Sequence, residues 1–145
     1  MTAPAAARQL GRPSAWLVLA LSGLFVLLGL LFLGAPRLGA AVFGLPAPQG
    51  PALAYLPAIG LRDLAFGLYL FALARTAPPA ALAAVLGITV LIPVGDVVIV
   101  ALERGRDSPG HLALHGASAL TMAAASAWVM LDAKRHRREH RRDAR

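Results

Sequence analysis

Apolar residues form four long runs along the chain, separated by short connections rich in proline, glycine or charged residues. The runs cover residues 15–33, 53–74, 80–102 and 110–131, and each is about as long as a helix that crosses a bilayer. The pattern therefore predicts an all-α fold, a four-helix transmembrane bundle within residues 14–131.

The connection between the first two runs, residues 36–50, is itself apolar. It carries Leu38, Ala41, Val42 and Leu45 at helical spacing, and several prolines follow. This spacing predicts a short interfacial or re-entrant helix and then a proline-rich turn. We expect the segment to be a connector in the headgroups or a lid.

Composition supports the membrane class, and the positions of the basic residues show where the positive charge lies. Hydrophobic residues make up 58% of the 145-residue chain, and mean hydropathy is +0.67. The formal net charge is +7, but seven of the fourteen Lys and Arg lie in a tail, residues 132–145. Anionic lipid headgroups are the expected partner of such a tail. No aromatic residues alternate with its basic ones, so nucleic-acid binding is not predicted.

The positions of the basic residues also predict an orientation. Both tails, residues 1–13 and 132–145, share one side with the turn at Arg75, and together they hold ten Lys and Arg. Three arginines lie on the opposite side. Because loops rich in Lys and Arg stay in the cytoplasm, both termini are expected there, in a bacterial cytoplasmic membrane.

The second apolar run contains adjacent charged residues, Arg62 and Asp63, on two different helix faces. Asp63 shares its face with small residues, whereas Arg62 shares the other with Tyr55 and Tyr69. Neighbours in a helix do not face each other, so each charge needs its own partner. Because charged side chains are costly in hydrocarbon, the bundle is expected to enclose them.

The third and fourth runs carry polar residues at helical spacing. Thr89 and Asp96 share a face of the third run, with Pro93 predicting a kink between them, and His111, His115 and Ser118 share a face of the fourth. At 1.5 Å of rise per residue, Asp63, Asp96 and His115 all lie roughly 6–15 Å from the outer ends of their helices. We therefore predict one cluster of Arg62, Asp63, Asp96 and His115, with His111 at its mouth.

Two carboxylates and a histidine in low dielectric can divide into one protonated acid and one base. Such a site suits proton transfer on a small lipophilic molecule, for example isomerisation, epoxide opening or cyclisation. The candidate catalytic residues are Asp63, Asp96 and His115. The candidate substrate-binding residues are Arg62, Tyr55, Tyr69, Thr89 and Ser118.

Three other interpretations stay open. The same groups could relay protons in a small transporter, or they could only fix helix packing in a structural subunit. His111 and His115, four residues apart, could bind a metal with Asp96, although the glutamate of an H-E-x-x-H motif is absent. No phosphate-binding loop, dinucleotide fingerprint or nucleophile elbow occurs, and the chain has no cysteine, so no cofactor is predicted. A homodimer is expected, because four short helices enclose little volume.

Several motifs together resemble an uncharacterised family of small four-helix membrane proteins, catalogued as a domain of unknown function. They are Phe-Gly-Leu-Pro at residues 43–46, Gly-x-Arg-Asp-x-x-x-Gly at residues 60–67, and the later Asp96 and His115. A more distant similarity is to DoxX-like membrane proteins. The resemblance covers about residues 16–131 and implies the fold, but it supplies no activity.

Overall fold

The computed structural model describes residues 10–105 and 107–143, which fold into helices without strands. The elements are α1 (Arg12–Gly34), α2 (Pro36–Phe43), the 3-10 helix η2 (Gly50–Ala54), α3 (Tyr55–Thr76), α4 (Pro79–Thr89), α5 (Leu91–Arg104) and α6 (Pro109–Asp143). Four segments of this described part are long and apolar enough to cross a membrane: Pro13–Gly34, Gly50–Thr76, Pro79–Arg104 and Pro109–Glu139. The prediction of an all-α bundle with four transmembrane helices is confirmed.

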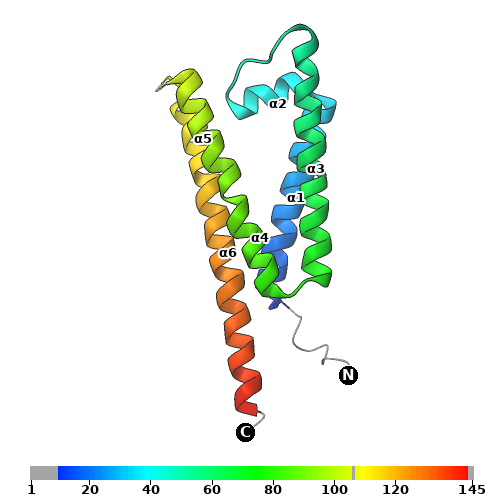
Figure 1. Cartoon of the computed structure of the whole chain (residues 1–145), viewed down its shortest axis with the longest axis vertical. Helices are drawn as coiled ribbons and strands as arrows, with labels where there is room; N and C mark the ends of the chain where they lie inside the picture. Colours follow the sequence, from blue (N-terminus) through cyan, green and yellow to red (C-terminus); the bar gives the residue numbers. More distant parts are fainter. Residues whose placement is uncertain (1–9, 106, 144–145) are drawn as a thin grey trace.

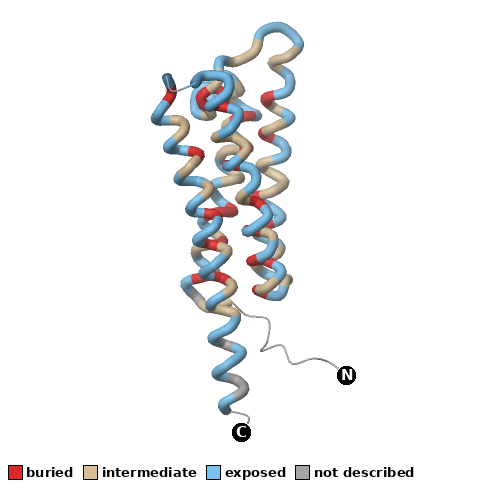
Figure 2. The backbone as a smooth tube through the Cα atoms, turned by 60° about the vertical axis from the view of Figure 1, so that its left-hand side comes forward, coloured by how far each residue is buried: buried red, intermediate tan, exposed pale blue. Residues whose placement is uncertain are grey.

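The spans are arranged as two helix pairs, with α1 along α3 and with α6 along α4 and α5 (Figure 1). At the end where α1 begins, the pairs meet in one apolar core, and buried positions lie on the facing sides of the helices (Figure 2). Core members are Val18, Leu21, Leu70, Leu82, Ala83, Leu86, Met122, Ala125 and Val129. At the other end, the short helix α2 lies between the pairs, and polar contacts of α2 with α6 join them there.

Glycines allow α1 and α3 to approach at backbone distance. A Cβ atom on Gly60 would lie 2.7 Å from the carbonyl oxygen of Gly29, and one on Gly67 would lie 2.8 Å from that of Ser22. The Ser22 hydroxyl donates a 2.7 Å hydrogen bond to the carbonyl of Gly67. Both glycines of the Gly-x-Arg-Asp-x-x-x-Gly motif therefore serve helix packing, as small residues commonly do in membranes.

The third span is interrupted between α4 and α5. Val90 has no place in either helix, and its N–H donates to Gly87 in a tighter turn at 3.3 Å. Pro93 has no N–H for the carbonyl of Thr89, which removes one helical hydrogen bond at this place. The break sets the direction of α5 and hence the position of Asp96.

The start of α1 is tied to α6 through Asp132. The Asp132 carboxylate accepts hydrogen bonds from the N–H of Gly11 at 2.9 Å and from the hydroxyl of Ser14 at 2.7 Å. The Ser14 side chain is fully buried. A carboxylate at a helix N-terminus satisfies free N–H groups and interacts favourably with the positive end of the helix dipole. This contact therefore holds α1 and α6 together at the end of the bundle where α1 begins.

We expect Asp132→Ala to lower the free energy of unfolding by about 2–3 kcal/mol, because a charged acceptor is lost and buried donors are left unpaired. Thermal unfolding in detergent micelles measures the effect. Glu103→Ala is the matched control, since it removes the same charge from an exposed side chain near the end of α5. An equal change in both variants would show that the loss is one of net charge alone.

Candidate functional site

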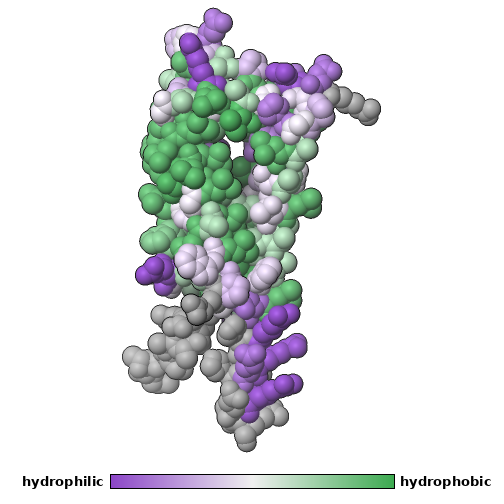
Figure 3. All heavy atoms as spheres, turned by 180° about the vertical axis from the view of Figure 1, so that it is seen from behind, coloured by the Kyte–Doolittle hydropathy of each residue, from purple (hydrophilic) through white to green (hydrophobic). Residues whose placement is uncertain are grey.

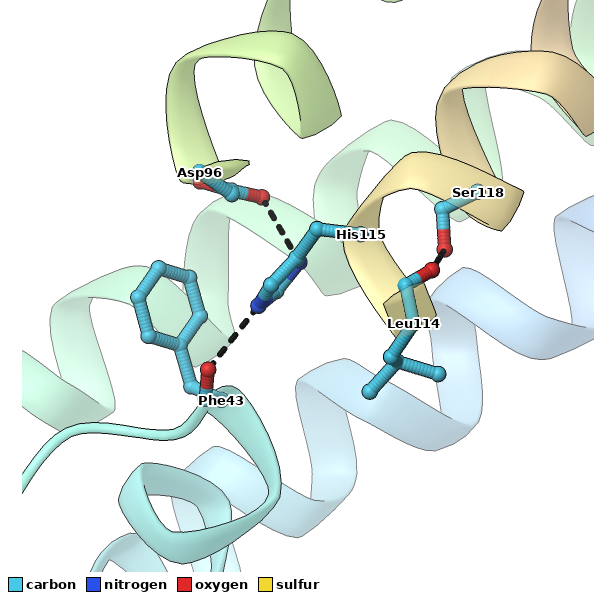
Figure 4. Close-up of polar contacts among 5 residues, drawn as sticks. All are labelled: Phe43, Asp96, Leu114, His115 and Ser118. Carbon is cyan, nitrogen blue, oxygen red and sulfur yellow. Dashed lines mark hydrogen bonds and ion pairs between the residues drawn. The ribbon is translucent and has the colours of Figure 1, made fainter. Parts of the chain in front are cut away.

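His115 makes polar contacts with two other helices at the end of the molecule where α2 lies. Its Nε2–H donates to the carbonyl oxygen of Phe43 at 2.8 Å, and its Nδ1 lies 3.6 Å from Oδ2 of Asp96 (Figure 4). The Phe43 ring also packs against the imidazole, with centroids 4.8 Å apart. One side chain of α6 therefore contacts both α2 and α5.

This geometry fixes the hydrogen on one nitrogen of His115. The carbonyl of Phe43 can only accept, so Nε2 of His115 carries a hydrogen. Nδ1 faces Oδ2 of Asp96 at 3.6 Å, which is longer than a hydrogen bond. An imidazole and a carboxylate that lie side by side can each hold a proton, so the two side chains are candidates for proton transfer.

His111 makes a second contact between α6 and α2. Its Nδ1 is 2.7 Å from the hydroxyl of Ser108, and its Nε2 is 3.1 Å from the carbonyl of Ala41. Carbonyls in the last turn of a helix have no intrahelical partner, so imidazole donors from α6 cap the end of α2. Gly44 completes this turn at φ +99°, and a Cβ there would lie 2.5 Å from the His111 ring. Glycine is required by the backbone angle and by the close ring.

Asp63 and Arg62 approach the same cluster from α3. Asp63 interacts electrostatically with Asp96, and Arg62 does so with both carboxylates. Nε of Arg62 is 4.0 Å from Oδ1 of Asp63. The exposed fraction of the side chain falls from 67% at Arg62 to 23% at Asp96, 17% at Asp63 and 9% at His115. The cluster thus has an inner end at His115 and an outer edge at Arg62. The prediction that the bundle encloses both charges of α3 holds for Asp63 but is wrong for Arg62, because Arg62 lies on a different face of the helix and points out of the bundle.

The surface is hollowed between the two helix pairs in the half of the molecule that holds α2 (Figure 3). Around this recess the surface is mostly apolar, while polar side chains gather at the two ends (Figure 3). A separate hollow of about 250 Å³ lies on the last turns of α6, between Arg135, Arg138, Glu139 and Arg142. That hollow is exposed and charged and does not suit a lipophilic molecule. A ligand pocket at the cluster stays a prediction.

The remaining predicted site residues lie apart from the cluster's contacts. The hydroxyls of Thr89 and Ser118 each donate to a carbonyl of their own helix, at 2.8 and 2.9 Å. Tyr55 and Tyr69 are exposed on α3. The cation-π contact on this helix is made by Arg75, which lies 5.7 Å from the Phe71 ring centroid. A role for these residues in substrate binding stays a prediction.

The metal interpretation receives no geometric support. Among the side chains that the structure describes, no three from His, Cys, Asp and Glu are grouped as a metal site. The nitrogens of His111 and His115 face a hydroxyl, a carboxylate and two carbonyls instead. These contacts join helices to one another and leave the imidazole nitrogens facing protein groups instead of a common metal position.

Sequence reasoning missed the acceptors that give the histidines their positions. They are the backbone carbonyls of Ala41 and Phe43, together with the Ser108 hydroxyl. Phe43 belongs to the Phe-Gly-Leu-Pro motif, whose glycine ends a helix and leaves carbonyls free. The sequence signal for these acceptors was therefore the glycine that ends a short predicted helix, because the free carbonyls of a helix end need donors such as the two histidines.

Four helices that are long and apolar enough to cross a bilayer define the class: an integral, multi-pass α-helical membrane protein. Residues 22–129 match the family described as Domain of unknown function (DUF4267). The chain belongs to this family, and the predicted relation to an uncharacterised family is confirmed. No curated protein and no solved structure matches the chain.

Proposed function

We propose that the protein binds a small lipophilic molecule between its two helix pairs and converts it by acid/base chemistry. One observation carries the proposal: the His115 imidazole lies inside a span between Asp96 and the Phe43 carbonyl, and Asp96 interacts electrostatically with a second carboxylate, Asp63. Ionisable groups inside a membrane are costly and are usually kept for function.

The proposed roles follow from the contacts. The His115–Asp96 pair donates a proton to one atom of the substrate, and ionised Asp63 takes a proton from another. The substrate is thereby isomerised, and the pair and Asp63 exchange protonation states. Return of the proton from Asp63 to the pair restores the site. Arg62 holds an oxygen of the substrate at the outer edge.

Single substitutions Asp63→Asn, Asp96→Asn and His115→Gln test this proposal. We expect Asp63→Asn to keep the free energy of unfolding within about 1 kcal/mol of the parent, because its contact with Arg62 is long and partly exposed. Lipid extracts of cells producing the parent protein should contain a species that is absent when Asp63→Asn is produced. Mass spectrometry of the extracts and melting temperatures of the purified proteins are the measurements.

A structural role is the second candidate, favoured by the contacts of His111 and His115 with α2. It predicts that all three substitutions lower the melting temperature and that none changes the lipid extract. Buried polar pairs can serve to fix helix register in this way. Unchanged extracts together with uniform destabilisation would therefore replace the enzymatic proposal.

We also propose that both termini are cytoplasmic and that the end of α6 meets anionic headgroups. Helix α6 runs without a break to Asp143, and Lys134, Arg135 and Arg138 are exposed on it. Basic residues next to a span contribute about 1 kcal/mol each at an anionic surface. Protease accessibility of the C-terminus in inside-out and right-side-out vesicles tests the orientation.

A further inference from the structure

Arg62 is only weakly paired among the residues that the structure describes. It lies inside the membrane span Gly50–Thr76, twelve residues after its first residue, and its side chain is 67% exposed. Its one ion pair is the 4.0 Å contact between Nε and Asp63. Within the described residues, the two terminal nitrogens of the guanidinium have no hydrogen-bond acceptor.

Such an arrangement is incomplete in a bilayer. Guanidinium carries five N–H donors and stays protonated, and a charge at this depth costs about 2.5–3.5 kcal/mol when it faces hydrocarbon. Arg62 is also the most exposed member of the cluster. A molecule that approaches the cluster from the lipid therefore meets the guanidinium first.

We infer that Arg62 binds the carboxylate of a lipophilic carboxylic acid, which lies with its apolar body in the recess between the helix pairs. This rests on the proposed function and names its substrate class. The planar guanidinium fork matches a carboxylate in a bidentate geometry. The apolar surface beside the recess matches a hydrocarbon body (Figure 3).

Charge balance at the site favours an acid over a permanent anion. Arg62 is balanced by Asp63, so an added anion would leave a net negative charge beside the guanidinium. A carboxylic acid enters from the bilayer in its neutral form. Its O–H bond breaks, the proton passes to the carboxylate of Asp96, and the ligand carboxylate pairs with Arg62. Total charge is unchanged, and Asp63 stays ionised as the proposed base.

Binding of radiolabelled oleate to the full-length protein in phosphatidylcholine nanodiscs tests the inference. We expect Arg62→Gln to weaken binding about tenfold or more, because a charge-assisted pair is lost. Arg62→Lys should be intermediate, since it keeps the charge without the fork. Asp63→Asn should bind the oleate anion at least as tightly as the parent, because it removes the competing carboxylate. Arg75→Gln, at the end of the same helix, is the matched control and should bind like the parent.

Other results would overturn the inference in distinguishable ways. Equal binding of oleate and radiolabelled methyl oleate would show that the site does not recognise the carboxylate. That result would overturn the role of Arg62 but not the proposed binding of a lipophilic molecule. Loss of oleate binding on adding phosphatidylglycerol would assign Arg62 to headgroup phosphate. If chemical cross-linking shows a dimer of the parent and only a monomer of Arg62→Gln, then Arg62 contacts a second copy of the chain instead of a ligand. Absence of binding by either probe would remove the lipophile site together with the inference.

Discussion

Gly60→Ala is expected to destabilise the bundle by about 3 kcal/mol, although alanine is the better helix former. The new Cβ would lie 2.7 Å from the carbonyl oxygen of Gly29 and 2.9 Å from the backbone nitrogen of Leu33. Both are backbone atoms that no change of rotamer can move. Helices α1 and α3 must therefore separate, and their contact along both spans is lost. Unfolding in a detergent titration measures the change.

Gly23→Ala on α1 is the matched control. A Cβ at Gly23 would meet nothing within 4 Å, so the same chemical change should be neutral or should stabilise the protein by up to about 1 kcal/mol through helix propensity. If Gly60→Ala and Gly23→Ala have the same free energy of unfolding, close packing at Gly60 does not stabilise the pair of helices α1 and α3.

Removing both histidines, His111→Ala with His115→Ala, is expected to release α2 from α6. The carbonyls of Ala41 and Phe43 would lose their donors. The Phe43 carbonyl is partly buried, and an unpaired buried group costs about 1–3 kcal/mol, whereas the Ala41 carbonyl is exposed and costs less. Asp96 would also lose the imidazole beside it. We therefore expect α2 to move away from α6 while the apolar core at the other end stays formed.

Distances between spin labels can follow this movement, because the chain has no native cysteine. Leu38→Cys on α2 and Leu114→Cys on α6 are both exposed and provide the labels. The parent should give a narrow distance distribution and the double histidine variant a broad, longer one. Ser118→Ala is the control, since its hydroxyl bonds only its own helix. An unchanged distribution in the double variant would mean that the linker and apolar contacts alone hold α2.

Residues in the cluster could be predicted as a set, but their pairing could not. Depth from the helix ends placed Asp63, Asp96 and His115 at one level, because rise per residue in a helix is constant. Which carboxylate His115 faces depends on the rotation of α5 after its break at Val90. That rotation comes from packing between helices, which no local pattern encodes.

The sequence by itself determined the membrane class, the number of spans and which residues are costly to place in hydrocarbon. These follow from the cost of placing polar groups in hydrocarbon, which depends on composition and length along one segment. Only the tertiary structure decided that α2 is capped by His111 and His115, and that Arg62 lies at the outer edge of the cluster. The acceptors are backbone carbonyls, which every residue carries, so only the approach of two helices selects which of them bind.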